Sequence, residues 1–241
     1  MHCFDALDKK LFELLRQQYG VKENIARMVD EAEREAAARF AEIDRICQFN
    51  QYRVLSAFRS ERIALRHFSP TTGYGYDDCG RDALDRVFAR CMGAEDALVR
   101  PQIVSGTHAL ALMLFGVLRP GDELLSITGK PYDTLETTIG ISGDSPSSLK
   151  ALGVSYAQVE LGEDGGIDAE AAIRAITDKT RVVHIQRSRG YAWRRALTVE
   201  EIGRAIAAIK AAKPSVIVTV DNCYGEFTAT EEPTAAGADL M

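Results

Sequence analysis

Residues 216–227, VIVTVDNCYGEF, decide the fold because they join an apolar run to a polar turn. Four of the first five side chains are apolar and β-branched, which is typical of a strand buried on both faces of a parallel sheet. Asp221 follows at the carboxyl end of this strand, where ligands bind in open α/β sheets. A buried carboxylate is costly unless a cation or a hydrogen-bond donor meets it. The function therefore depends on what Asp221 meets.

The overall composition is that of an ordinary soluble globular protein. The 241 residues include 29 basic and 35 acidic side chains, a net charge of −6, which gives no electrostatic case for nucleic acid or an anionic membrane. No apolar run approaches the roughly 20 residues that span a bilayer, and the N-terminus lacks the pattern of a signal peptide. The five scattered cysteines form no CxxC pair, so we expect no metal site, no disulfide framework and a cytoplasmic location.

Residues 1–70 are predicted to form a helical arm. Apolar side chains recur at helical spacing on both sides of Gly20, and Ala, Glu and Arg are abundant after Lys22. We expect helices over residues 5–49 and 51–66. Their apolar face packs either on its own domain or against a second copy of the chain. A loop rich in Gly and Asp follows over residues 71–80, and its composition is typical of an exposed or functional loop.

Strands and helices alternate in the rest of the chain. After a helix from residue 82, we expect strands over 97–99, 123–127, 154–159, 180–185 and from 216, and helices from 106, 134, 145, 168 and 198. This alternation predicts an α/β domain over residues 71–241, with a mostly parallel and doubly wound sheet.

Three further stretches at element ends carry candidate chemistry. Gly106 and Thr107 open a helix whose free N–H groups and dipole suit a phosphate, although many helices begin with small residues for no such reason. Tyr132 either lies flat on a planar ligand or is a half-buried loop tyrosine. Arg187 and Arg189 suit a carboxylate or phosphate, and the alternative is a solvated basic loop.

Together with Asp221 these stretches describe one ligand, pyridoxal phosphate. The phosphate would lie at the helix start and the aromatic ring would stack on the cofactor. Asp221 would pair with the pyridinium nitrogen, which keeps the ring an electron sink. The chain contains neither GxGxxG nor GxxxxGKS, so neither a nicotinamide fingerprint nor a P-loop is present.

The motifs SGTHA, KPYDTLE, HIQRSRGY, VDNCYGEF and EPTAAGADL follow one another in this order. With GYGYDDCGRDALD, they closely resemble the aluminium-resistance or methionine γ-lyase-like family, which belongs to the fold-type I (aspartate aminotransferase-like) pyridoxal phosphate enzymes. The resemblance covers nearly the whole chain. It implies that Gly106 and Thr107 bind the cofactor phosphate, that Tyr132 stacks on the ring, that Asp221 binds its nitrogen and that Tyr224 lies near it.

The resemblance also implies a homodimer or homotetramer with shared sites. Tyr74 and Tyr76 match a loop that reaches the cofactor phosphate of a neighbouring subunit in related lyases. Arg187 and Arg189 become candidates for substrate or cofactor anions. The implied reaction on an amino-acid substrate is loss of a thiol from a sulfur amino acid, leaving a 2-oxo acid and ammonia. Elimination at the β or the γ carbon stays open.

One departure from the family pattern concerns the catalytic lysine. Family members carry the Schiff-base lysine shortly after GADL, followed by a small C-terminal domain, and this chain ends at Met241. We therefore expect that lysine beyond Met241 and interpret the chain as the N-terminal part of a longer carbon–sulfur lyase. The alternatives are a catalytically inactive fragment that serves as an interaction module and a different α/β ligand-binding protein. Five lysines exist elsewhere but none occupies the family position: Lys130, Lys150, Lys179, Lys210 and Lys213.

Overall fold

The computed structural model describes residues 6–73 and 78–241. The chain forms two compact units, Met1–Gln48 and Phe49–Met241. Their boundary lies inside helix α2, Glu23–Ser60, so this helix contributes residues to both units. The division that we predict at residue 70, between a helical arm and a cofactor-binding domain, is a different boundary and stays a prediction.

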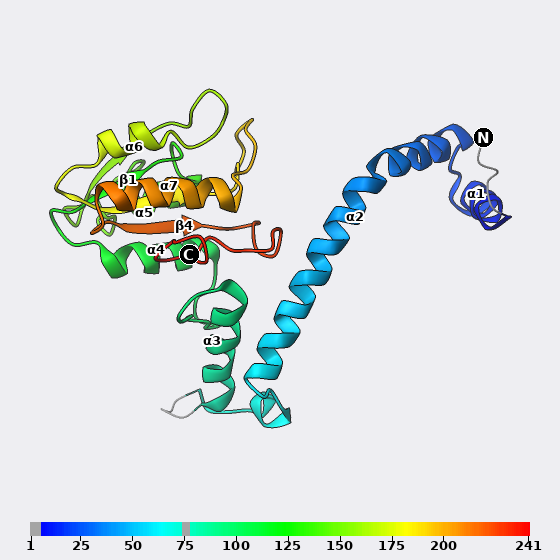
Figure 1. Ribbon diagram of the computed structural model, residues 1–241, viewed down its shortest axis with the longest axis horizontal. Coiled ribbons are helices and arrows are strands. Elements are labelled where there is room, and N and C mark those ends of the chain that lie inside the picture. Colours follow the sequence, from blue (N-terminus) through cyan, green and yellow to red (C-terminus); the bar gives the residue numbers. More distant parts are fainter. Residues whose placement is uncertain (1–5, 74–77) are drawn as a thin grey trace. The chain divides into compact units, whose positions relative to one another are not determined.

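The first unit consists of α1, Ala6–Tyr19, and the N-terminal part of α2, both drawn in blue in Figure 1. Gly20 separates the two helices with a φ of 66°, a left-handed conformation that glycine adopts without strain. The separate helix predicted over residues 51–66 is wrong, because α2 continues unbroken to Ser60. No glycine or proline lies between Gly20 and Pro70 to interrupt it. A short 3-10 helix, Leu65–Phe68, follows.

The second unit is built on a four-stranded sheet in the order β2-β1-β3-β4. All three strand pairings are parallel, which confirms the predicted parallel sheet. At its carboxyl edge Gln186 lies opposite Asp221. The strands are β1, Glu123–Ser126; β2, Ser155–Gln158; β3, Thr180–Gln186; and β4, Ile217–Asp221.

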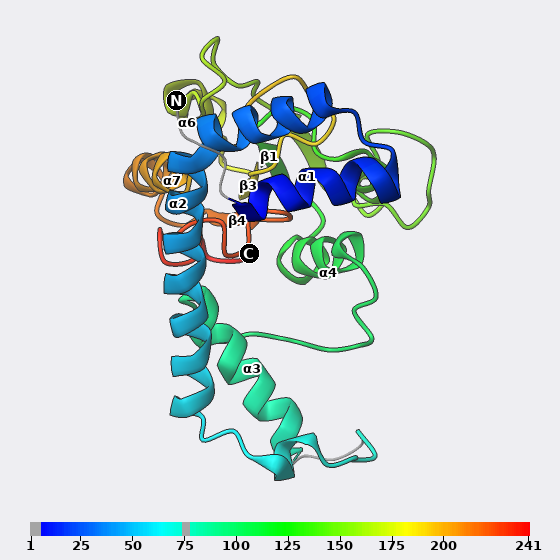
Figure 2. The same cartoon turned by 90° about the vertical axis from the view of Figure 1, so that its right-hand side faces the viewer.

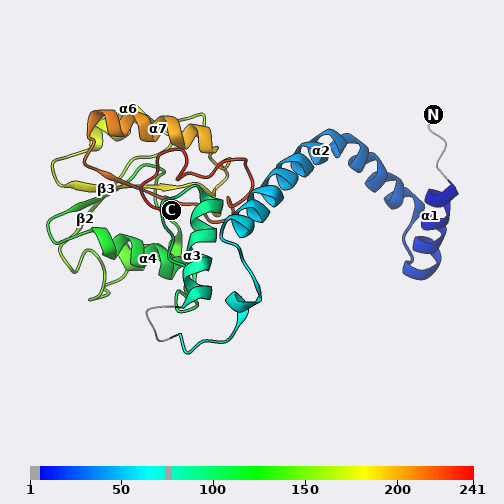
Figure 3. The same cartoon turned by 60° about the horizontal axis from the view of Figure 1, so that its bottom comes forward.

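Helices cover both faces of this sheet, as Figures 1 and 3 show. On one face, α6 (Ala169–Ala175) and α7 (Val199–Ala212) contribute apolar side chains to a core cluster with β1, β3 and β4. On the other face, α4 (Gly106–Val117) and α5 (Asp133–Ile139) pack against a second cluster. The doubly wound arrangement is therefore confirmed. Burial of each large aliphatic side chain in these clusters stabilises the fold by roughly 1.5–3 kcal/mol.

Helix α3, Cys79–Met92, lies beside the C-terminal end of α2 (Figure 2). Ala57 of α2 and two side chains of α3, Val87 and Cys91, form a small buried cluster. Glu61 adds ion pairs to Arg86 and Arg90 of α3 at 2.6 and 2.5 Å. These hydrogen bonds hold the pKa of Glu61 below its ordinary value.

Two further predicted elements are wrong, and in both cases hydrogen bonds to other segments explain the difference. Residues 97–99 form no strand, because the Val99 N–H donates to Asp85 Oδ1 of α3 at 2.8 Å. Residues 145–153 form turns instead of a helix, because the Leu149 N–H donates back to the Thr138 carbonyl at 2.9 Å. The capping box predicted at the start of α7, between Thr198 and Glu201, is confirmed.

Candidate cofactor site at the carboxyl edge of the sheet

Asp221 ends β4 and is 8% exposed. Its Oδ1 accepts the N–H of Cys223 at 3.0 Å, and its carbonyl accepts the N–H of Arg187 at 3.0 Å. Within the described parts of the chain, no donor bonds Oδ2. The carboxylate is thus held in place by one oxygen and keeps an acceptor for a ligand on the other.

His184 lies one layer deeper, on β3, and is 1% exposed. Its Nδ1 is 2.9 Å from Thr219 Oγ1, and its Nε2 has no partner among residues 6–73 and 78–241. Burial lowers the pKa of His184 to about 4, although the negative charge of Asp221 acts in the opposite direction. The imidazole is therefore neutral near pH 7, and it leaves the charge of Asp221 available to a ligand.

Gln186 ends β3 beside Asp221 and carries a second buried atom without a partner. Its Nε2 donates to the Ser188 carbonyl at 3.2 Å, whereas its Oε1 meets no donor in the part of the chain that the structure describes. Buried polar atoms in native proteins are nearly always hydrogen-bonded, to the protein or to a bound molecule. Unpaired atoms on both His184 and Gln186 therefore mark this edge as a site for a polar ligand.

The N-terminus of α4 supplies the second part of the site. Ser105 caps the helix by accepting the His108 N–H at 3.1 Å. The N–H groups of Gly106 and Thr107 have no acceptor among the described residues. A Cβ on Gly106 would meet no atom within 4 Å, so the space in front of the helix is open. Thr107 Oγ1 lies 2.7 Å from Thr134 Oγ1, which joins this open end to the start of α5.

Tyr132 precedes α5 and stacks on Tyr191 from the loop after β3. Their ring centroids are 5.8 Å apart with an interplanar angle of 27°, and the Tyr132 hydroxyl donates to that of Tyr191 at 3.2 Å. This hydrogen bond raises the pKa of Tyr132 to about 12. Gly190 lies close to the side chains of Gln186 and Tyr132, because a Cβ on it would be 3.4 Å from the first and 3.6 Å from the second. The stacked rings of Tyr132 and Tyr191, called the aromatic plate below, therefore lie next to the end of β3.

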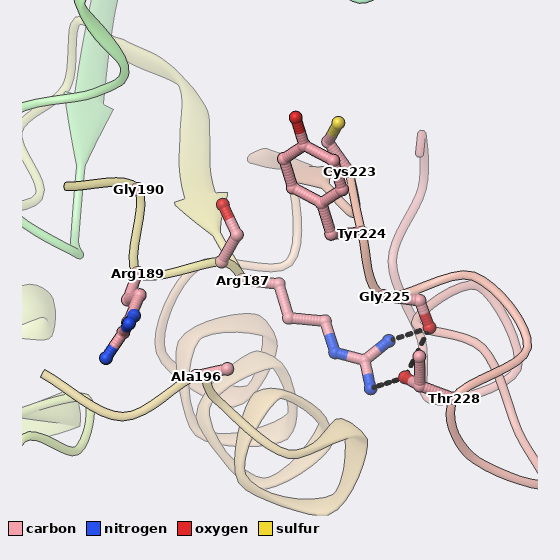
Figure 4. Close-up of a pocket in the computed structure, with 9 residues that line it drawn as sticks. Arg187, Arg189, Gly190, Ala196, Cys223, Tyr224, Gly225 and Thr228 are labelled. Carbon is pink, nitrogen blue, oxygen red and sulfur yellow. Dashed lines mark hydrogen bonds between the residues drawn. The ribbon is translucent and has the colours of Figure 1, made fainter. Parts of the chain in front are cut away.

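A cavity of about 340 Å³ lies between the loops that follow β3 and β4 (Figure 4). Tyr224 lines it, with a backbone φ of 68°, and this residue is 86% exposed. Arg187 also lines it, and its guanidinium donates to protein oxygens of both loops, including the Gly225 carbonyl at 2.9 Å. Burial lowers the pKa of Arg187. Arg189 is exposed, and Figure 4 shows its guanidinium pointing away from Tyr224.

A series of contacts thus brings most of the predicted residues to one place. The hydroxyl of Thr107 contacts that of Thr134, which lies two residues after Tyr132. Tyr132 lies close to Gly190, and Gly190 lies close to Gln186. Gln186 in turn lies opposite Asp221 in the sheet. The anion-binding roles of Arg187 and Arg189 stay predictions, and Tyr74 and Tyr76 lie outside the described residues.

Sequence reasoning missed several residues that support the site. Thr134 had no signal beyond its place at a helix start. Asn222 stands next to Asp221, and that adjacency is a usable signal. Glu232 is buried whereas Glu231 is exposed, and nothing in the local sequence distinguishes the two.

The described residues also bear on metals and membranes. They contain no group of three or more His, Cys, Asp or Glu side chains placed to hold a metal ion. In the same residues, no helix combines the length and the apolar character required to cross a membrane.

Comparison with known proteins assigns the chain to a family. Residues 25–241 match the family described as methionine gamma-lyase. The chain belongs to this family. The uncharacterised protein YnbB of Bacillus subtilis strain 168 is 50% identical over 212 residues, which are 88% of this chain and 50% of that protein.

Two solved structures are similarly close. A carbon–sulfur lyase involved in aluminium resistance from Clostridium novyi shares 44% identity and a TM-score of 0.89, over 98% of this chain and 56% of that one. A protein from Listeria monocytogenes, provisionally assigned as a cystathionine beta-lyase involved in aluminium resistance, shares 49% identity and a TM-score of 0.85, over 88% and 52%. This chain spans about half the length of these relatives.

The fold extends to more distant enzymes. An apo methionine gamma lyase from Micromonospora echinospora shares 22% identity and a TM-score of 0.52 over 73% of this chain. That likeness shows the common α/β fold.

Proposed function

We propose that this chain forms the cofactor-binding part of a pyridoxal phosphate-dependent carbon–sulfur lyase that acts on a sulfur amino acid. The observation that carries the proposal is the series of contacts from the open start of α4 to Asp221, in a member of the methionine gamma-lyase family. Its relatives that are named as carbon–sulfur lyases support the reaction class.

The residues at the carboxyl edge fit pyridoxal phosphate in charge and in hydrogen-bonding capacity. Gly106 and Thr107 offer N–H groups at the positive end of a helix dipole, which suits the phosphate. Tyr132 offers an aromatic face to the ring. Asp221 has an acceptor oxygen for the ring nitrogen, and His184, two residues before the end of the neighbouring strand, has an unpaired Nε2. When bound, the cofactor supplies an electron sink for charge that develops on the substrate.

The chain's own residues would prepare the site for this chemistry. Asp221 would hold a proton at the ring nitrogen, because a buried carboxylate stabilises a cation beside it. The neutral imidazole of His184 would preserve that effect, since it adds no competing positive charge. Tyr132 would stay a neutral phenol up to a pH of about 12.

Three further parts of the proposal concern the assembly, the location and the substrate anion. We place the enzyme in the cytoplasm, because its four described cysteines are unpaired. A homodimer or homotetramer would allow Tyr74 and Tyr76 to reach a neighbouring site. Arg189, which is exposed at the cavity, is the candidate for the amino-acid carboxylate.

The test is cofactor binding by an Asp221→Asn variant of the full-length polypeptide. Charge-assisted hydrogen bonds contribute roughly 1.5–3 kcal/mol, so we expect affinity for pyridoxal phosphate to fall about 10- to 100-fold in equilibrium dialysis. Glu226→Gln, an exposed change in the same loop, is the matched control and should keep the parent affinity. Equal affinity in parent and Asp221→Asn would contradict the assignment. A parent that binds no pyridoxal phosphate would favour the cofactor-free interaction module.

A further inference from the structure

Glu232 is a buried carboxylate that the cofactor site does not use. It is 1% exposed and lies at the far end of the turn that follows Asp221. Its Oε1 accepts the Phe227 N–H at 2.9 Å and an Arg53 N–H at 3.1 Å, and its Oε2 accepts the Asn222 side-chain N–H at 3.0 Å. A buried charge is retained only with such partners. Glu232 therefore joins both ends of the turn to one another and to α2.

Arg187 holds the same turn from the side of β3. Its Nη1 donates to Asn222 Oδ1 at 2.8 Å. Its guanidinium also donates from Nη1 to the Gly225 carbonyl at 2.9 Å and from Nη2 to Thr228 Oγ1 at 3.2 Å (Figure 4). The Nη1 atom lies 4.0 Å from Glu232 Oε2. A Cβ on Gly225 would lie 2.5 Å from Nη1, so glycine is required for the guanidinium to lie against this backbone.

Helix α2 contributes the third attachment. Asn50 donates to the Phe227 and Ala229 carbonyls at 2.8 and 3.0 Å. Arg53 donates to the Thr230 carbonyl at 3.1 Å, and its guanidinium lies 5.3 Å from the centroid of the Phe227 ring. Phe227 has a φ of 59°, an uncommon conformation for a bulky residue that needs support from its surroundings. The turn is thus fixed from three directions.

The fixed turn matters because of what it orients. The only donor to the Asp221 carboxylate among the described residues is the Cys223 N–H. That N–H belongs to the peptide directly after Asn222, whose side chain is held between Arg187 and Glu232. Release of Asn222 would free the peptide that orients the carboxylate. It would also free Tyr224, whose left-handed backbone lies in the same turn.

We propose that Arg187 and Glu232 are positioning residues that lock the turn after β4 and thereby orient Asp221 and Tyr224. This inference rests on the proposed function for the use that is made of Asp221. It gives Arg187 a different role from the anion binding that the sequence suggests, since four of its five donor hydrogens already bond protein oxygens.

The first test is amide hydrogen exchange of the full-length polypeptide without cofactor, followed by mass spectrometry. We compare Glu232→Gln with Glu231→Gln, its exposed neighbour, and Arg187→Lys, which changes the residue directly after β3, with Arg181→Lys, an exposed position on β3. The proposal predicts exchange at least about tenfold faster in residues 222–230 for Glu232→Gln and Arg187→Lys, with β4 still protected. The two control variants should exchange like the parent. Parent-like exchange in Glu232→Gln and Arg187→Lys would overturn the proposal.

A milder variant keeps the test decisive if Glu232→Gln loosens the whole sheet. Arg53→Gln removes one donor to Glu232 and the other contacts of this guanidinium with the turn, and it leaves Arg187 and Glu232 themselves in place. Faster exchange confined to residues 222–230 would support the locked turn, and unchanged exchange there would refute it.

Cofactor affinity then separates this inference from the proposed function. Faster exchange with weaker pyridoxal phosphate binding in Glu232→Gln supports both. Faster exchange in a protein whose parent form binds no pyridoxal phosphate supports the locked turn and refutes the proposed function. Unchanged exchange with normal cofactor binding in the parent refutes the locked turn alone.

Discussion

Acid should destabilise this protein through His184 before it affects most carboxylates. The pKa of His184 is lowered from an ordinary value of 6.5 to about 4 in the folded chain, because burial disfavours the charged imidazolium. The unfolded chain therefore binds a proton that the folded chain does not. The stability linked to this group is present above pH 6.5 and is lost as the pH falls towards 4.

The expected magnitude follows from these two pKa values. Between about pH 7.5 and about pH 5.0, the linkage relation gives a loss of roughly 2 kcal/mol in the free energy of unfolding. Carboxylates add little in this range. Glu201, for example, has its pKa lowered to about 2 by its hydrogen bond to Arg195, so its contribution is lost mainly at lower pH.

Urea denaturation at both pH values measures this loss directly. In His184→Asn the amide takes the place of the imidazole beside Thr219, and we expect the free energy of unfolding at neutral pH to fall. Because this side chain does not titrate, most of the loss of about 2 kcal/mol between the two pH values should disappear. His67→Asn, a change in the 3-10 helix, is the control and should keep the full acid sensitivity. Equal pH dependence in the parent and in His184→Asn would refute the reasoning.

Two further predictions concern the aromatic plate and the core. Tyr191→Phe removes the hydroxyl that accepts from Tyr132, so the pKa of Tyr132 should fall from about 12 towards 10 in a tyrosinate absorbance titration, and an unchanged titration would contradict the pairing. Leu124→Ala empties a fully buried site between β1 and α4 and should lower the free energy of unfolding by about 2–5 kcal/mol. Leu98→Ala, at a position that is 65% exposed, should change it by less than about 0.5 kcal/mol, and equal losses in the two variants would mean that the core is misassigned.

The sequence predicts the elements of the sheet domain well where periodicity and caps agree. The β-branched run before Asp221 and the capping box at Thr198 each produce the expected strand or helix. The prediction fails at residues 97–99, because a side chain of α3, Asp85, takes the backbone hydrogen bond that a strand would have used. Local periodicity contains no information about such a competitor.

Some residues of the candidate site can be predicted from the sequence and others cannot. Residues at strand and helix ends, such as Asp221 and Tyr132, are predictable because a parallel sheet gathers those ends at one edge. The residues that support them are not. The hydrogen bond from Asn50 to Phe227 joins residues 177 positions apart, and only the folded chain brings them together.

That separation has a consequence for the order of folding. Each doubling of a closed loop adds roughly 0.6 kcal/mol of entropy cost, so the contacts of Asn50 and Arg53 with the turn after β4 are among the most expensive to close. Contacts between such distant residues slow folding. During synthesis the end of α2 leaves the ribosome before the turn after β4 is made, so these contacts form only after the turn has been synthesised. We therefore expect the contacts of Asn50 and Arg53 with this turn to be among the last to form as the chain folds.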